Sequence, residues 1–348
     1  MATLPTHRPN QTTGLKACCL GLVVAAAHTV AGAAGPAFLV SAYKDVSLGT
    51  DPAQPRIATA VAGGPAALLP DAAGRLPAGL PSLTWSFATG PCAQERWGLF
   101  DAARFARLNV AAFALAGLPY FVATGGQAGI FTCDSDADMD AFVARYSSPQ
   151  LLGFDFDIEG EQTAEQITSL MQRIRHVQRQ RPALQWRFTL ATHAASDGSG
   201  QSLNRTGQAV LAALDAAGIE HAIINLMVMD YGPASPKVCV VGPTGRCDMG
   251  ASALQAALNV HRKHGVPLHR IALTAMLGVN DVRDNVFTPD DARRMARDAR
   301  AQGLAGVLFW SLDRDRPCPA DQTGAVLPTC HGLPGLEPWA FSRALLGD

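Results

Sequence analysis

The stretch Leu151-Leu-Gly-Phe-Asp-Phe-Asp-Ile-Glu-Gly160 alternates bulky apolar residues with carboxylates at the two-residue period of a β-strand. Its apolar side chains would face one side, and Asp155, Asp157 and Glu159 the other. A strand followed directly by a glycine and a long helical segment is typical of a parallel sheet covered on both faces. Three carboxylates would then crowd into a poorly solvated place, where at least one should keep its proton near neutral pH. The pattern therefore predicts a general acid.

The composition indicates one large globular domain. The chain has 348 residues, 48% of them hydrophobic, with 33 Gly and 23 Pro to supply turns. Its formal net charge is −1, and no block of Lys or Arg stands out, so we expect no nucleic-acid partner. No internal repeat or appended module is evident, and a monomer is expected.

Residues 1–33 have the three-part layout of a secretory signal peptide. Arg8 and Lys16 precede an apolar run at 17–27, which ends in small residues near Ala33. We expect cleavage after Ala33 and export of residues 34–348 to the periplasm or the cell exterior, with no membrane attachment afterwards. An uncleaved anchor and a buried first helix are the alternatives.

Six of the eight cysteines lie outside this segment, in predicted loops, as an even set that suits the disulfides of an exported protein. Sequence proximity favours Cys239 with Cys247 and Cys318 with Cys330, which leaves Cys92 with Cys133. Free thiols are the alternative. Zinc is not expected, because no C-x-x-C or clustered Cys/His spacing is present.

Strand and helix patterns alternate along the rest of the chain. Strands are predicted at 37–43, 82–88, 119–124, 151–160, 185–192, 222–229, 270–277 and 306–310. Helices are predicted at 100–108, 137–146, 164–180, 207–217, 251–263, from 288 onward, and near 338–346. Eight such strands in roughly 300 residues is the count of a (β/α)8 TIM barrel.

Polar and aromatic residues gather where these strands end. Asp230 and Tyr231 follow the sixth predicted strand, Asn280 and Asp281 follow the seventh, and Trp310 closes the eighth. The carboxyl ends of the strands carry the active site in barrels of this kind. Together with the carboxylates of the fourth strand, these residues predict an active site at one mouth of the barrel.

The sequence resembles the bacterial chitinases of glycoside hydrolase family 18. The fourth-strand motif of that family, D-G-x-D-x-D-x-E, is matched by Gly153, Asp155, Asp157 and Glu159, while Leu152 replaces its first Asp. The resemblance extends over most of the predicted mature chain. It includes the segments 227–232, 275–281 and 309–315.

The resemblance implies retaining hydrolysis of β-1,4-linked N-acetylglucosamine, in chitin or chito-oligosaccharides, without an enzyme nucleophile or a cofactor. Glu159 would be the general acid and base. Asp157 would orient the 2-acetamido group of the substrate, and Asp155 would share a proton with Asp157.

The resemblance also assigns residues around this acid. Tyr231 would hold the acetamido carbonyl oxygen, although other branches place the Tyr before the Asp, where this chain has Met229. Asp230 would shape the same subsite, and Trp310 would form an indole floor beneath the sugar. Gly125 and Gly126 resemble the third-strand S-x-G-G motif, with Ala123 in place of Ser. We add Asn280 and Met229 as substrate-binding residues on their strand-end positions.

Three alternatives stay open at this stage. The acidic motif could supply oxygen ligands to Mg²⁺ or Ca²⁺, although the other strand ends add aromatic and amide groups rather than further ligands. An endo-β-N-acetylglucosaminidase acting on N-glycans would share all these residues. A chitin-binding lectin on the same barrel typically lacks the acid, so the intact Glu159 argues against it.

Overall fold

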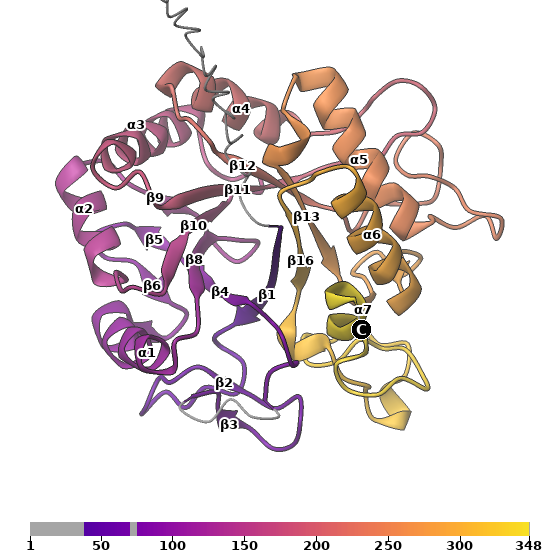
Figure 1. The fold of residues 1–348 in the computed structure, drawn as a ribbon, viewed down its shortest axis with the longest axis horizontal. Coiled ribbons are helices and arrows are strands. Elements are labelled where there is room, and N and C mark those ends of the chain that lie inside the picture. The colour runs from indigo at the N-terminus through magenta and orange to yellow at the C-terminus, as the bar shows by residue number, and fades with distance from the viewer. Residues whose placement is uncertain (1–37, 70–74, 348) are drawn as a thin grey trace, which may run out of the picture. The chain divides into compact units, whose positions relative to one another are not determined.

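Eight parallel strands close into a barrel in the order β1-β16-β13-β12-β11-β10-β8-β4 (Figure 1). The architecture comes from a computed structural model, which describes residues 38–69 and 75–347. The strands are β1 (Leu39–Asp45), β4 (Ser82–Ala88), β8 (Tyr120–Gly125), β10 (Leu151–Asp157), β11 (Gln185–Ala191), β12 (Ile223–Met227), β13 (Ile271–Met276) and β16 (Gly306–Trp310). The predicted (β/α)8 fold is confirmed. The predicted signal segment at 1–33 lies outside the described residues and stays a prediction.

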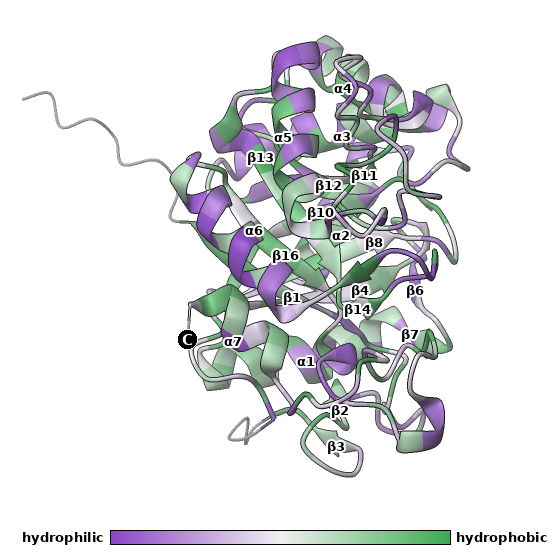
Figure 2. Cartoon of the chain, turned by 90° about the vertical axis from the view of Figure 1, so that its right-hand side faces the viewer, coloured by the Kyte–Doolittle hydropathy of each residue, from purple (hydrophilic) through white to green (hydrophobic). Residues whose placement is uncertain are grey.

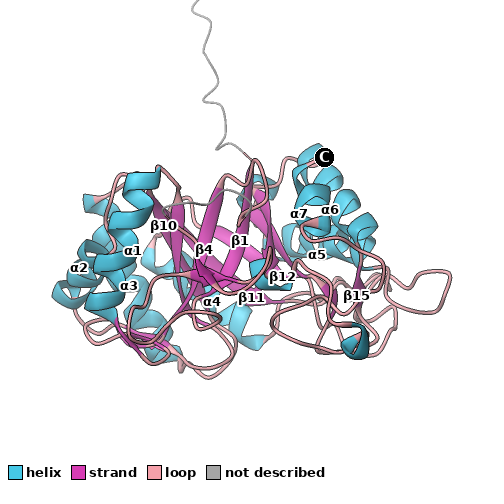
Figure 3. Cartoon of the chain, turned by 90° about the horizontal axis from the view of Figure 1, so that it is seen from below, coloured by secondary structure: helices cyan, strands magenta, loops and turns pink. Residues whose placement is uncertain are grey.

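The described residues include seven α-helices. Figure 3 shows helices around the barrel strands. The seven helices are α1 (Ala102–Ala116), α2 (Asp136–Arg145), α3 (Ala164–Gln180), α4 (Arg205–Ala217), α5 (Met249–His264), α6 (Pro289–Ala301) and α7 (Ala340–Leu346). Within residues 38–69 and 75–347, no helix is both long and apolar enough to cross a bilayer.

Local sequence explains where these helices begin and which side they bury. In α6, Thr288 and Asp291 cap each other reciprocally, and Pro289 occupies the first turn. Figure 2 shows hydrophilic residues along α6, whereas four small or apolar residues of this helix are buried. Such an amphipathic pattern lets a helix cover the barrel with one face and meet water with the other.

The first βα unit departs from a regular barrel. Between β1 and β4, the described residues contain no α-helix, and β2 (Ala58–Thr59) pairs with β3 (Ala66–Ala67) instead. The helix predicted at 100–108 begins two residues later and continues to Ala116, because residues 110–116 include no helix breaker before Gly117.

Short strands and 3-10 helices shape the loops around the barrel. The strands are β5 (Gly90–Pro91), β6 (Arg96–Trp97), β7 (Phe100–Asp101), β9 (Phe131–Thr132), β14 (Gly278–Val279) and β15 (Val286–Phe287). The 3-10 helices are η1 (Leu268–Arg270), η2 (Leu312–Arg314) and η3 (Ala320–Gln322). The pairing of β5 with β9 joins the loop after β4 to the loop after β8.

Three disulfides staple these loops in the predicted pairing: Cys92 with Cys133, Cys239 with Cys247, and Cys318 with Cys330. The first spans 41 residues and lies next to the contact between β5 and β9, since the Cys92 backbone N–H donates to the Thr132 carbonyl. It therefore ties the loops that follow β4 and β8.

Removing this first disulfide should destabilise the fold more than removing the second. For the loop of 41 residues opened in Cys92→Ala/Cys133→Ala, the chain-entropy model gives a loss of about 4 kcal/mol in the free energy of unfolding. For the loop of 8 residues opened in Cys239→Ala/Cys247→Ala, the same model gives a loss of about 2.5 kcal/mol. Urea unfolding of both variants beside the unchanged protein measures the free energies of unfolding. Equal losses would contradict a loop-length effect.

Candidate active site

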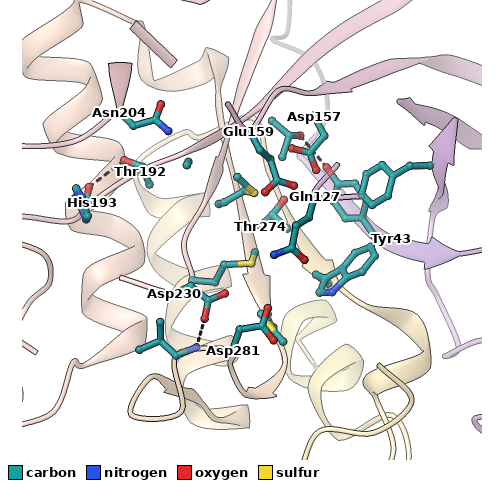
Figure 4. A pocket seen from close by; sticks show the side chains of 18 of the residues that line it. Tyr43, Gln127, Asp157, Glu159, Thr192, His193, Asn204, Asp230, Thr274 and Asp281 are labelled. Carbon is teal, nitrogen blue, oxygen red and sulfur yellow. Dashed lines mark hydrogen bonds between the residues drawn. The ribbon is translucent and has the colours of Figure 1, made fainter. Parts of the chain in front are cut away.

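A cavity of about 490 Å³ opens where the barrel strands end (Figure 4). Its walls contain six of the strand-end residues predicted for the site: Asp157, Glu159, Met229, Asp230, Asp281 and Trp310. The other lining residues are Tyr43, Phe87, Gln127, Thr189, Ala191, Thr192, His193, Ser202, Asn204, Met227, Thr274, Met276 and Val282. The lining residues thus converge from all eight barrel strands or the loops that follow them.

Asp155 lies behind the cavity rather than on its wall. Its side chain is fully buried, and both carboxylate oxygens accept hydrogen bonds. Tyr43 Oη donates to Oδ2 at 2.6 Å, and Thr189 Oγ1 donates to Oδ1 at 2.6 Å. Arg187 Nη2 lies 3.2 Å from Oδ2 in a buried ion pair. These contacts fix Asp155 firmly, and Asp157 is not among its hydrogen-bond partners.

Asp157 ends β10 and faces the cavity with 6% of its surface exposed. Its Oδ1 atom has no hydrogen-bond partner among the described residues. Burial, and then the negative charges of Glu159 and Asp155, raise the pKa of Asp157 well above its ordinary value. Asp157 is therefore a protonated or readily protonated carboxyl at the cavity wall.

Glu159 follows the end of β10, half-buried, and points into the same cavity as Asp157 and Asp230 (Figure 4). Burial, and then the charge of Asp230, raise the pKa of Glu159. Burial also raises the pKa of Asp230, whose Oδ1 accepts the Val282 backbone N–H at 2.7 Å. Three carboxyls with raised pKa values thus line the cavity, and such groups keep a proton to a higher pH than free carboxyls do.

Besides Asp155 and the glycines of β8, two further predicted site residues, Tyr231 and Asn280, do not line the cavity. Tyr231 is 2% exposed, its hydroxyl has no partner among the described residues, and its backbone N–H donates to Asn285 Oδ1 at 2.7 Å. Burial raises the pKa of the Tyr231 hydroxyl. Asn280 is fully buried and donates to the backbone carbonyls of Met276 and Gly278 at 3.0 and 3.1 Å. Asn280 thus stabilises the backbone turn after β13.

An aromatic corner forms one side of the cavity. The ring centroids of Phe87 and Trp310 lie 5.5 Å apart at an interplanar angle of 26°, and Tyr43 lies 6.2 Å from each. Such a surface suits the apolar face of a sugar ring. Trp85 and Trp97, in contrast, are fully buried in the core of the protein.

Gly125 and Gly126 shape the site through the backbone, with φ angles of 83° and 81°. A Cβ on Gly125 would lie 2.1 Å from the Asp157 carbonyl oxygen, and a Cβ on Gly126 would lie 2.9 Å from the Phe87 ring. The Gly126 N–H also donates to the Asp157 carbonyl at 3.1 Å. This glycine pair therefore allows the end of β8 to pack against the residues that carry the acid and the aromatic corner.

Several wall residues were not predicted from the sequence. Gln127 directly follows the glycine pair, and Thr192, His193 and Asn204 come from the segment between β11 and α4 (Figure 4). Strand-end position was the available signal for Thr192 and His193, whereas Asn204 also caps α4. Burial lowers the pKa of His193, so its imidazole is neutral near pH 7.

The described residues contain no group of three or more His, Cys, Asp or Glu side chains arranged to hold a metal ion. Leu152, which stands where the family motif has Asp, lies at the register irregularity between Leu151 and Gly153. The presence of Leu152 instead of Asp leaves the carboxylates of the cavity in place.

The fold and the site define a (β/α)8 barrel with a carboxylate cluster at the mouth. No protein-family model matches the chain. It is 29% identical over 254 residues to a probable bifunctional chitinase/lysozyme of Escherichia coli strain K12, a match that covers 68% of this chain and 27% of the relative. It is 34% identical over 125 residues to endochitinase 11 of Metarhizium anisopliae, covering 33% of this chain and 23% of the relative. The matched regions thus make up about a quarter of the length of these curated relatives.

Among solved structures, the catalytic domain of a hyperthermophilic chitinase from Pyrococcus furiosus superposes with a TM-score of 0.67. The match has 24% sequence identity and covers 90% of this chain and 95% of that domain. At this identity, the likeness shows the same barrel fold.

Proposed function

We propose that this chain is a retaining chitinase, which hydrolyses β-1,4-linked N-acetylglucosamine in chitin or chito-oligosaccharides. The main observation behind this proposal is that Asp157, Glu159 and Asp230 line the same cavity as the aromatic corner. It is supported by the sequence similarity to a chitinase/lysozyme and to an endochitinase.

Glu159 protonates the glycosidic oxygen, and the substrate's own acetamido oxygen attacks the anomeric carbon to give an oxazolinium ion. Asp157 accepts the acetamido N–H and offsets the positive charge that develops there. Glu159 then takes a proton from the incoming water, which opens the oxazolinium ring and leaves the β configuration unchanged. The raised pKa of Glu159 suits the first step, because the residue must hold a proton at the working pH.

The charge of the cavity favours a neutral sugar chain over an anionic one. Its wall carries the carboxyls of Asp157, Glu159, Asp230 and Asp281, and no lysine or arginine is among the lining residues. The lactyl carboxylate and peptide acids of peptidoglycan would meet like charge there, at a cost in binding. We therefore place chito-oligosaccharides ahead of peptidoglycan as substrates.

We also propose export to the periplasm or cell exterior after removal of residues 1–33, with 34–348 as the catalytic domain and a monomer as the working unit. Three disulfides support an oxidising location.

Incubation with chitotetraose, an N-glycoprotein and peptidoglycan, with products resolved by mass and the new anomer read by NMR, tests the proposal. We expect cleavage of chitotetraose to products that are initially β, little action on the other two, and no loss of activity in EDTA. Cleavage of the N-glycoprotein alone would favour an endo-β-N-acetylglucosaminidase. Binding of chitotetraose without cleavage would favour a lectin, and an EDTA loss restored by Mg²⁺ would favour a metal site.

A further inference from the structure

Arg187 of β11 is a buried cation inside the barrel, 1% exposed, in register with Asp155 of β10. Its guanidinium stacks 3.6 Å from the Phe121 ring centroid, and its Nη2 donates to Thr84 Oγ1 at 2.9 Å. The Nε and Nη1 atoms have no partner among the described residues. A buried cation is tolerated when a counter-charge lies close, and the Arg187 partner is Asp155 at 3.2 Å.

A network of hydrogen bonds leads through two hydroxyl groups to Asp155. Thr274 Oγ1 donates to Asn225 Oδ1 at 2.9 Å, which fixes the side-chain amide of Asn225. Asn225 Nδ2 then donates at 2.9 Å to both Tyr43 Oη and Thr189 Oγ1. Those two hydroxyls in turn donate to the two oxygens of Asp155. Two hydroxyl groups and the Arg187 guanidinium thus contact the Asp155 oxygens, and such contacts favour the ionised carboxylate.

We propose that Arg187 is a positioning residue that holds Asp155 ionised, so that the proton of the Asp155 and Asp157 pair resides on Asp157. This inference rests on the proposed function, and it replaces the shared proton that the family resemblance implies. The proton then stays at the cavity wall, where Asp157 can pass it to Glu159 as Glu159 protonates the glycosidic oxygen. Asp157 is then ionised when it offsets the charge of the oxazolinium ion.

Burial and the charges of Glu159 and Asp155 raise the pKa of Asp157, which is in accord with a proton on that residue. The titratable and charged groups facing this pair are Tyr43 from β1, Arg187 from β11 and Glu159 from the end of β10. Of these, Arg187 is the one positive charge, so its removal should change the titration of the pair most.

Replacing Arg187 by the uncharged, similarly long Met tests the assignment. Loss of the buried cation makes the negative charge of the Asp155 and Asp157 pair more costly, so the pair takes up its second proton at a higher pH. We expect the acid limb of kcat/KM on chitotetraose to move up by about one pH unit or more in Arg187→Met. Arg187→Lys should shift it less, and the surface control Arg181→Met not at all. If Arg187→Met instead loses the same factor of kcat/KM at every pH and the acid limb does not move, then Arg187 has only a packing role.

A measurement without substrate separates this inference from the proposed function. The Tm difference between the unchanged protein and Arg187→Met should be largest near neutral pH. It should become smaller on acidification, because full protonation of the carboxyl pair removes the unpaired buried charge. A difference that is constant with pH would overturn the role of Arg187, even if no oligosaccharide is cleaved. If Arg187→Met does not fold, Asp155→Asn/Arg187→Met should restore folding, since it removes both charges. Failure to restore it would count against the pair.

Discussion

Glu159→Gln is expected to lower kcat on chitotetraose by about 10²–10⁴-fold, which is the range for loss of a general acid and base. The side-chain amide has nearly the shape of the acid but can neither donate this proton nor take one from water. KM should change little, because the aromatic corner and the neighbouring carboxyls stay in place. The pH profile should change as well. In the unchanged protein, activity falls as pH rises through the raised pKa of Glu159, and that alkaline limb should be absent from the residual activity of the variant.

Initial rates on chitotetraose, together with binding of the oligosaccharide to Glu159→Gln by calorimetry, measure both parts of this expectation. Glu165→Gln makes the same chemical change on the exposed first turn of α3 and should keep full activity. If substantial hydrolysis survives in Glu159→Gln, another residue is the acid.

The alternation of the fourth strand predicted much of the candidate site. Because side chains point to opposite faces at a period of two, Asp155 and Asp157 had to lie on the inner side once the strand was parallel and covered. Strand-end position then predicted that Asp230 and Trp310 would meet them. Such inferences need only the local pattern and the rule that parallel strands end together.

Partners that are distant in the sequence could not be predicted in this way. Tyr43 and Asp155 are 112 residues apart, and their hydrogen bond depends on the closure of β1 against the other strands. Nothing in the sequence pattern distinguishes Arg187 from other polar strand residues. Its pairing with Asp155 is evident only once β11 lies beside β10.

Strand-end position also does not predict which residues line the cavity where the backbone turns sharply after a strand. Asp230 adopts a left-handed backbone conformation with φ of 49°. Tyr231, the next residue, is buried behind the wall rather than exposed on it. A residue after a strand thus reaches the cavity only if the turn allows it, and the turn conformation is not evident from the sequence pattern.

Asp157→Asn is expected to lower kcat on chitotetraose by about 10²–10³-fold, the cost of removing one group that stabilises a developing charge. The Asn side-chain oxygen can still accept the acetamido N–H, so binding should weaken only modestly. It cannot carry the negative charge that offsets the oxazolinium ion. The exposed α4 residue Asp215 provides the matched control, Asp215→Asn, which should leave kcat unchanged.

A substrate with a good leaving group separates the roles of Asp157 and Glu159. A nitrophenyl chitobioside needs little protonation to depart, so Glu159→Gln should release nitrophenol in a single turnover with a smaller loss than it shows on chitotetraose. The acetamido oxygen must attack in both substrates, so Asp157→Asn should lose about the same factor on each. If Asp157→Asn instead recovers on the aryl substrate as Glu159→Gln does, then Asp157 acts by supplying the proton of Glu159. Its contribution would then be to proton transfer and not to the acetamido group.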